Sequence, residues 1–248
     1  MLLAAMCIAL LFGGLAIGVA LGGLMPLPYG PIGPVQHYVQ TQSLAVRIIA
    51  VAVFGSSVLL AVYAATVSAR LRWLGDTGAG PTIALTGGIL AAGSLGLTGL
   101  LGWTLSRPEI TGDTTLVRAL YLLTFLVGGA AHVVALGVLI AGIATSGLAL
   151  GLLPRAVARV GIAIAVLCVL TMLVLAWQPL GPALPLARVA ALAWVGIAIA
   201  ALCELTMLVL AWQPLGPALP VARAAALAWL LVAGARLPKR RSNSTAAI

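Results

Sequence analysis

Charged residues are scarce in this sequence: they make up 7% of its 248 residues, whereas 63% are hydrophobic. A soluble domain of this size could not cover its surface with so few charges. Long apolar stretches recur along the chain, so most of it is expected to lie in a lipid bilayer. Spanning segments must satisfy their backbone groups internally, and these runs are too long for barrel strands. The sequence therefore predicts an all-α, polytopic transmembrane helix bundle.

Acidic residues are scarcer still, with 4 Asp and Glu against 13 Lys and Arg, and the formal net charge is +9. The basic residues lie in short loops and in the C-terminal tail and do not form a basic domain, which argues against nucleic-acid binding. In these places they set membrane topology and contact anionic lipid head groups. We therefore expect the lipid bilayer as the main partner. A protein partner or a homo-oligomer is the further alternative.

Three cysteines and two histidines do not make a cofactor site here. Cys7, Cys168 and Cys203 lie inside apolar segments without metal-binding or redox spacing, and we interpret them as buried thiols. His37 lies in the first predicted loop and His132 deep in a helix, so the two are not placed to share a metal or haem. The chain also has no Walker motif and no carboxylate pair. We predict no cofactor, no metal and no enzymatic activity.

About seven helices follow from the apolar segments. We expect them over residues 2–25, 44–69, 82–105, 116–144, 160–177, 186–212 and 221–235. The first run has no charged residue before it and is longer than a signal-peptide core, so we interpret it as a retained helix. Residues 26–43 form a polar connection rich in Pro, Gly and Gln. Residues 1–237 are expected to form one transmembrane domain, followed by a basic, disordered tail over 238–248.

A tandem duplication occupies the C-terminal part of the chain. Residues 160–194 and 195–229 are copies with a period of 35, and they differ only at Val166/Ala201, Val169/Glu204, Leu186/Val221 and Val189/Ala224. Each copy holds one helix, a QPLGPALP turn and the start of another helix. Nothing similar occurs upstream, so the pattern indicates a duplication and not a solenoid. Because no strong breaker separates the copies, we expect them to fuse into the long helix 186–212.

Three stretches carry a resemblance to a known family: LVRALYLLTFLVGG at 116–129, GLLPRAVARVGI at 151–162 and ALAWLLVAGARLPKRR at 226–241. In their order along the chain they resemble a group of uncharacterised actinobacterial integral membrane proteins of six helices, which is a family of domains of unknown function. The resemblance covers most of the chain. It implies a multi-pass protein of the bacterial inner (plasma) membrane, and it supplies no catalytic residue.

Two ionisable residues are expected within the membrane, where burying a charge is costly. His132 lies near the middle of its predicted helix, with Thr124 and Gly128 at four-residue steps on the same face. Glu204 is the only acid within a predicted span, and Val169 takes its place in the first copy. If His132 and Glu204 share a cavity, they could serve a small-solute or proton-coupled transporter. Alternatively, His132 is a neutral residue hydrogen-bonded to a neighbouring helix, and Glu204 is tolerated in a redundant copy.

A third hypothesis, an intramembrane hydrolase, rests on Ser94 in the segment GSLG and on His132 in the next helix. An intramembrane serine protease of the rhomboid type needs a histidine base beside its serine, and an oxyanion hole. The only asparagine is Asn243, in the tail, so no asparagine amide is available in the bundle core. We therefore rank a hydrolase below a transporter, and both below a non-enzymatic scaffold or partner subunit.

Small residues recur every four positions in two predicted helices. The two rows are Gly14, Gly18 and Gly22 in the first helix, and Gly88, Ala92 and Gly96 in the third. Such spacing leaves bare backbone along one face, where another helix can approach closely. We expect both rows to pack helices within one molecule, and dimerisation is the alternative.

Positive charge predicts the topology, because cytoplasmic loops are enriched in Lys and Arg. Arg70 and Arg72 follow the second predicted helix, and Arg155 and Arg159 follow the fourth, so both loops share one side if spans alternate. We expect that side, and the N-terminus, to be cytoplasmic. Seven full spans would place the basic tail outside, whereas its charge favours the inside. We therefore expect the last segment, 221–235, to lie at the interface or to insert only partly.

Overall fold

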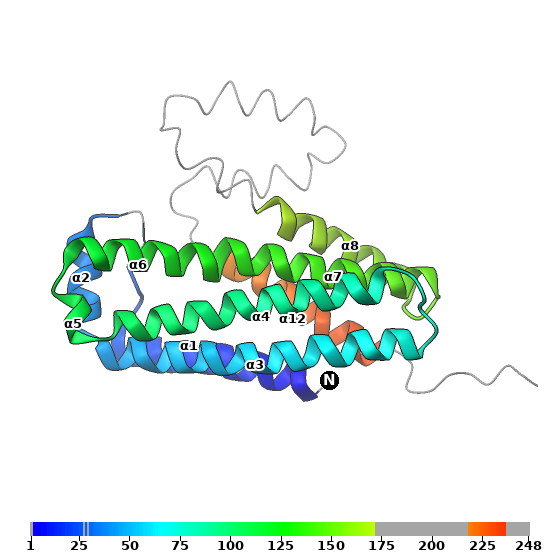
Figure 1. Ribbon diagram of the computed structural model, residues 1–248, viewed down its shortest axis with the longest axis horizontal. Helices are drawn as coiled ribbons and strands as arrows, with labels where there is room; N and C mark the ends of the chain where they lie inside the picture. The colour runs from blue at the N-terminus through cyan, green and yellow to red at the C-terminus, as the bar shows by residue number, and fades with distance from the viewer. Residues whose placement is uncertain (1, 27, 29, 172–217, 237–248) are drawn as a thin grey trace, which may run out of the picture.

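All secondary structure in the described part of this computed structural model is helical (Figure 1). The structure describes residues 2–26, 28, 30–171 and 218–236. The elements are α1 (Leu2–Gly22), α2 (Ile32–Thr41), α3 (Ser43–Trp73), α4 (Gly80–Leu105), α5 (Pro108–Thr111), α6 (Thr114–Leu126), the π-helical turn η1 (Val127–Ala131), α7 (His132–Ala149), α8 (Arg155–Leu170) and α12 (Ala218–Arg236). The predicted all-α class is confirmed for these residues. The expected helix 186–212 lies outside them.

Four helices in the described part are long and apolar enough to cross a membrane. They are α1, α3, α4 and the continuous helix Thr114–Ala149, which α6, η1 and α7 form together. Large apolar side chains are exposed along these helices, including Ile17, Val51, Ile89, Leu90 and Leu100. An apolar outer face of this extent is unfavourable in water and suits contact with lipid.

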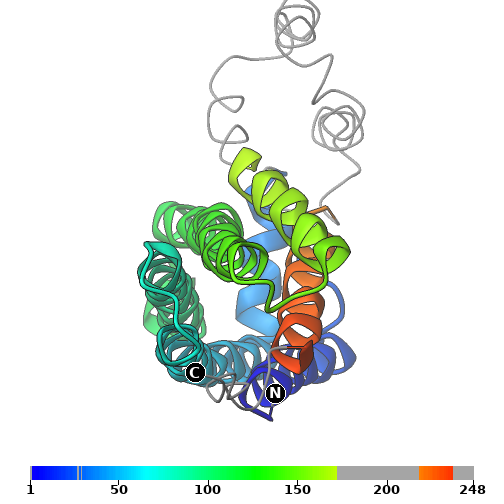
Figure 2. The same cartoon turned by 90° about the vertical axis from the view of Figure 1, so that its right-hand side faces the viewer.

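The long helices pack in chain order around a shared core (Figure 2). α1 packs on α3, α3 on α4, α4 on α7, and α7 on α8. The connections after α3 and α7 are short, and Gly75 and Gly151, with φ of 102° and 62°, lie in them. Glycine adopts this left-handed conformation without the strain that a side chain causes. Short turns of this kind place consecutive helices antiparallel.

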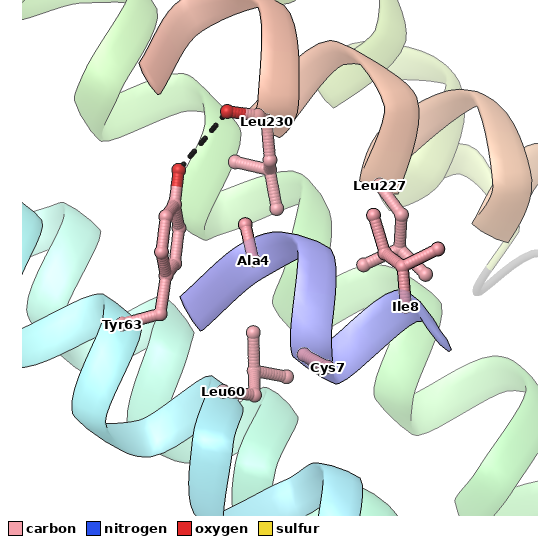
Figure 3. Close-up of a pocket in the computed structure, with 7 residues that line it drawn as sticks. All are labelled: Ala4, Cys7, Ile8, Leu60, Tyr63, Leu227 and Leu230. Atoms are coloured by element: carbon pink, nitrogen blue, oxygen red, sulfur yellow. Dashed lines mark hydrogen bonds between the residues drawn. The ribbon is translucent and has the colours of Figure 1, made fainter. Parts of the chain in front are cut away.

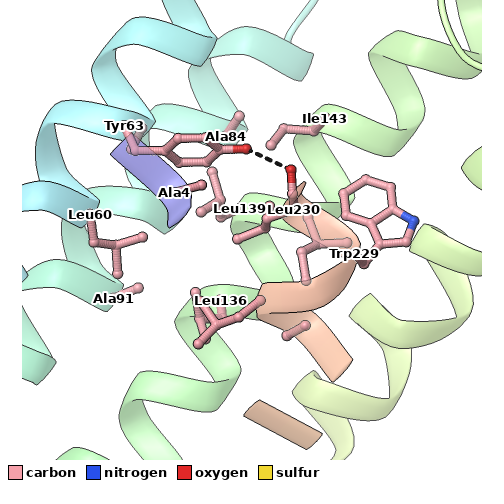
Figure 4. Close-up of a cluster of buried hydrophobic side chains, with 14 of the residues drawn as sticks. Ala4, Leu60, Tyr63, Ala84, Ala91, Leu136, Leu139, Ile143, Trp229 and Leu230 are labelled. Carbon is pink, nitrogen blue, oxygen red and sulfur yellow. Dashed lines mark hydrogen bonds between the residues drawn. The ribbon is translucent and has the colours of Figure 1, made fainter. Parts of the chain in front are cut away.

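The last described helix, α12, closes the bundle. It contacts α7, α8 and α1, so it lies beside the first helix of the chain. Figure 4 shows its side chains in the core, where the hydroxyl of Tyr63 donates to the backbone carbonyl of Leu230 at 3.1 Å. The Nε1 of Trp229 donates to the backbone carbonyl of Val157 at 3.0 Å. Ala226 and Leu230 are almost fully buried.

Alanines and glycine on one side of α12 let it approach its neighbours, and Leu and Trp fill the core. This packing does not measure depth in the membrane, so partial insertion or an interfacial position of residues 221–235 stays a prediction. α12 also runs in the same direction as α3, away from the end that holds α2 and α5 (Figure 1). Its last residue therefore lies at the same end of the bundle as the turn after α3.

Two short helices lie in segments that were expected to be loops, and α3 is longer than expected. α2 lies within the polar connection 26–43, and α5 lies between α4 and α6. α3 continues to Trp73, beyond the expected end at residue 69, because Arg70 and Arg72 are good helix formers and interact favourably with a helix C-terminus. The helix expected over 116–144 spans 114–149 and contains a π-helical turn.

Candidate functional site

His132 is fully buried near the middle of the long helix Thr114–Ala149. The π-helical turn η1 immediately precedes it, with the sequence VGGAA. These small residues let the wider turn fit against α4, where a Cβ on Gly128 would lie 2.8 Å from the hydroxyl oxygen of Thr98. π-helical turns are rare and occur frequently at functional sites. Because the π-helical turn and the buried imidazole are adjacent, we take the region around His132 as the candidate functional site.

The imidazole of His132 is hydrogen-bonded to α4. Its Nδ1 lies 2.8 Å from the carbonyl oxygen of Ala91. A carbonyl oxygen can only accept, so Nδ1 carries a proton and donates. Nδ1 therefore holds α7 to α4 and does not act as a base. Any proton transfer to His132 would have to use Nε2.

The structure does not bring Thr124 beside His132. The two residues are eight positions apart, which is roughly 12 Å along a helix. The hydroxyl of Thr124 donates to the carbonyl of Leu120 in its own helix, at 2.7 Å. Thr124 is therefore part of the helix surface of α6, and it is not a second polar group at the level of the imidazole.

Ser94 and Glu204 are the other two residues that the sequence hypotheses pair with His132. Ser94 is half-buried on α4, one turn from Ala91. Because the Nδ1 proton of His132 is directed to Ala91, that nitrogen cannot accept a proton from Ser94. Glu204, the proposed partner of His132 in proton transfer, lies outside the described residues.

The glycine row of α1 faces α3. A Cβ on Gly14 would overlap the side chain of Ala52, and a Cβ on Gly18 would overlap that of Ile49. Gly22 continues the row at the end of the helix, where a Cβ would lie 2.9 Å from the hydroxyl oxygen of Tyr38. Overlaps of this size show that α1 and α3 approach each other through bare backbone.

The second row lies on α4 and also faces α3. A Cβ on Gly88 would overlap the side chain of Ala64, and one on Gly96 would lie 3.1 Å from the hydroxyl oxygen of Ser57. Ala92, between them, is 7% exposed. Both rows therefore contact α3.

α4 and α7 contact each other through their backbones, and the glycine rows of the sequence did not predict this contact. A Cβ on Gly142 would lie 2.6 Å from the carbonyl oxygen of Gly80, and one on Gly87 would lie 2.7 Å from the carbonyl carbon of Val138. Backbone meets backbone here, so no side-chain movement could make room. The sequence does contain one signal for this contact, the adjacent pair Gly87 and Gly88. Adjacent residues on a helix point in different directions, so two adjacent glycines can face two different neighbouring helices.

A small apolar cavity lies between α1, α3 and α12 (Figure 3). Its volume is about 10 Å³, which is close to the space of one water molecule. The polar groups beside the cavity donate to backbone carbonyls. The hydroxyl of Tyr63 donates to the carbonyl of Leu230, and the thiol of Cys7 donates to the carbonyl of Ser56 at 3.3 Å. The cavity therefore offers neither the volume nor the polar groups that a solute would need.

Polar contacts gather at one end of the bundle, around α2 and α5. The side-chain amides of Gln36 and Gln40 both donate to the carbonyl of Thr111, at 3.1 Å and 2.9 Å. The hydroxyl of Thr114 donates to the side-chain oxygen of Gln36 at 2.8 Å. These bonds hold α2 against the connection between α4 and α6.

Two tyrosines complete this end. The hydroxyl of Tyr121 donates to the carbonyl of Pro26 at 2.6 Å, and that of Tyr38 donates to Gly23 at 3.3 Å. Burial raises the pKa of the Tyr38 hydroxyl above its ordinary value. Tyr38 and Tyr121 also belong to a separate small apolar cluster, together with Val117. We interpret these contacts as structural, and we call this end of the bundle, around α2 and α5, the α2 cap.

Among the described residues, no three His, Cys, Asp or Glu side chains lie close enough together to hold a metal ion. No protein-family model, curated protein or solved structure matches the chain.

Proposed function

We propose that the chain is a multi-pass integral membrane protein with a structural, non-enzymatic role, as a scaffold or as the partner subunit of a membrane complex. The observation that carries the proposal is the tightly packed core at mid-membrane depth. There the buried imidazole of His132 donates to the carbonyl of Ala91, and α4 and α7 meet through glycines. A solute pathway needs a polar cavity at this depth, and the cavity beside α1 is small and apolar.

The proposed orientation follows the charges. Arg70, Arg72, Arg155 and Arg159 lie at one end of the bundle, where α12 also ends. Enrichment of arginine favours the cytoplasm for this end. The N-terminus and the basic tail would then share the cytoplasmic side of a bacterial inner membrane.

Flux measurements on the purified full chain test the structural role against transport. In vesicles with an imposed pH gradient, we expect proton and solute flux no greater than in protein-free vesicles. His132→Leu and Thr124→Val should leave this background unchanged. A flux that His132→Leu abolishes and Thr124→Val preserves would establish a transporter and refute the proposal.

Complex formation tests the role directly. After gentle extraction from native membranes, the chain should appear in an assembly of fixed stoichiometry by native mass spectrometry. Recovery of a monomer alone, under conditions that preserve a known membrane complex in the same extract, would contradict the proposed role.

A further inference from the structure

An apolar groove runs along the outer face between α1 and α3. Its volume is about 620 Å³. Ile17 and Val51 border it, and a Cβ on Gly13 would meet nothing within 4 Å, so no other part of the described chain covers this floor. Apart from Arg47, every lining residue is Gly, Ala, Val, Leu or Ile. The groove is therefore open to a long apolar ligand.

Arg47 gives the groove a single charge, and the walls supply no acid to balance it. α1 contains no charged residue, and the only charged residues of α3 are arginines. The acids of the described chain are placed elsewhere: Asp76 follows the far end of α3, Glu109 pairs with Arg107 at 3.6 Å, and Asp113 caps α6. Arg47 is exposed, so an anion from outside the molecule can reach its guanidinium.

The groove has the depth of one lipid leaflet. Arg47 and Gly55 are eight positions apart on α3, so the groove is roughly 12 Å long, against about 15 Å for half of a bilayer core. The Arg47 end is also the end of Trp103, whose ring lies 5.0 Å from the guanidinium of Arg107. Exposed Trp and Arg at a helix end belong at the head-group level. The groove thus begins at that level and runs inward.

A second copy of the chain fits this groove less well. A two-fold dimer would place the same surface of both copies in contact. The two Arg47 side chains would then approach each other, without an acid from α1 or α3 of either copy. Like charges brought together in a membrane are unfavourable. An anionic amphiphile satisfies both the arginine and the apolar surface.

We propose that this groove binds one anionic glycerophospholipid. Its phosphate pairs with the guanidinium of Arg47, and one acyl chain lies over Gly13 between Ile17 and Val51. The bound lipid seals the contact between α1 and α3 on the membrane side. This site is separate from the basic loops at the opposite end of the bundle.

Native mass spectrometry of the full chain in detergent tests the site, with phosphatidylglycerol and phosphatidylcholine of identical acyl chains as probes. Phosphatidylglycerol should bind about tenfold more tightly, which corresponds to one charge-assisted contact. Arg47→Gln should remove this preference and weaken phosphatidylcholine binding much less than phosphatidylglycerol binding, because the choline cation already offsets the phosphate charge of phosphatidylcholine. Gly13→Leu should weaken the binding of both lipids several-fold, because the new side chain occupies the acyl-chain position.

Two matched variants act as controls. Arg118→Gln removes another exposed arginine near the same end, and Gly93→Leu adds a leucine where a Cβ also meets nothing within 4 Å. Neither should change the binding of either lipid. Equal effects of Arg47→Gln and Arg118→Gln, or wild-type binding in Gly13→Leu, would overturn the proposal. Efficient disulfide-linked dimers of Gly13→Cys in membranes would also overturn it, in favour of a second copy.

Discussion

At the residue scale, glycines set the distance between α4 and α7. Gly87 and Gly142 face backbone atoms of the opposite helix, whereas Gly93 of the same α4 faces open space. The same residue type therefore has two different roles along one helix. Gly87 and Gly142 cannot accept a methyl group without a shift of the helices, because backbone cannot move aside as a flexible side chain can.

Gly87→Ala should destabilise the protein by about 1–3 kcal/mol, because the added methyl group overlaps the backbone around Val138 and Leu139. Gly93→Ala, the control, should be neutral or slightly stabilising, since alanine is the better helix former. Thermal unfolding in detergent measures both. Equal melting temperatures for the two variants would show that α4 and α7 are not in close contact.

The buried tryptophan of α12 offers a second test at this scale. Trp229→Phe keeps most of the apolar volume but removes the hydrogen bond from Nε1 to the carbonyl of Val157. The expected loss is about 1 kcal/mol. Trp73→Phe replaces an exposed ring and should have no measurable effect. A Trp229→Phe protein as stable as the wild type would place α12 away from α8.

At the element scale, the π-helical turn sets the rotation of α6 relative to α7. The extra residue in this turn lets Val117 and Tyr121 face the α2 cap while His132 faces α4. An unbroken α-helix of the same sequence would turn one of the two faces by roughly a quarter of a circle or more. The turn therefore connects two packing surfaces that a regular helix could not serve together.

Deleting Gly129 should convert the turn into regular α-helix and destabilise the protein by more than about 2 kcal/mol. The loss combines the Tyr121 hydrogen bond with burial of Val117. Inserting one alanine after Leu126 in the deletion variant should restore the helix length and most of the melting temperature in detergent. A deletion variant with wild-type melting would refute the role of the turn.

The long helices could be predicted from the sequence, but the short ones could not. Apolar runs above about 18 residues are a strong signal because the bilayer sets their length. α2 has no such signal: it contains Gly33 and Pro34 and depends on contacts of Gln36 and Gln40 with Thr111, far away in the sequence. The π-helical turn was missed for a similar reason, since its small residues are equally compatible with an α-helix.

The candidate site was predictable only in part. The sequence singles out His132 because an ionisable group in a long apolar run is costly wherever it points. Its partner, the carbonyl of Ala91, has no sequence signature, because every residue carries a backbone carbonyl. The glycine rows have a period, but which neighbour they face depends on how the helices are arranged. Gly142 belongs to neither of these rows, so its close contact with α4 is recognisable only in the structure.

At the scale of the whole molecule, α12 and the duplication decide how the bundle closes. The core side chains of α12 include Ala226, Leu227 and Trp229, which lie in the second copy. The first copy has the same residues at the equivalent positions, namely Ala191, Leu192 and Trp194. Each copy therefore carries the sequence information for the first part of the core face of α12, whereas Leu230 and Ala233 follow the second copy.

Deleting residues 195–229 joins Trp194 to Leu230 and recreates the α12 sequence, apart from Leu for Val221 and Val for Ala224. Both changes are apolar, and the residues that bond to Tyr63 and Val157 are kept. We therefore expect the shortened chain to fold with nearly unchanged melting. Its tail should remain on the side of the N-terminus, because the recreated helix would run parallel to α3. A C-terminal reporter pair, one member active only in the cytoplasm and the other only outside, would measure the side. An external tail in the shortened chain, or loss of the folded protein together with a stable full-length control, would show that the second copy supplies contacts that the first cannot replace.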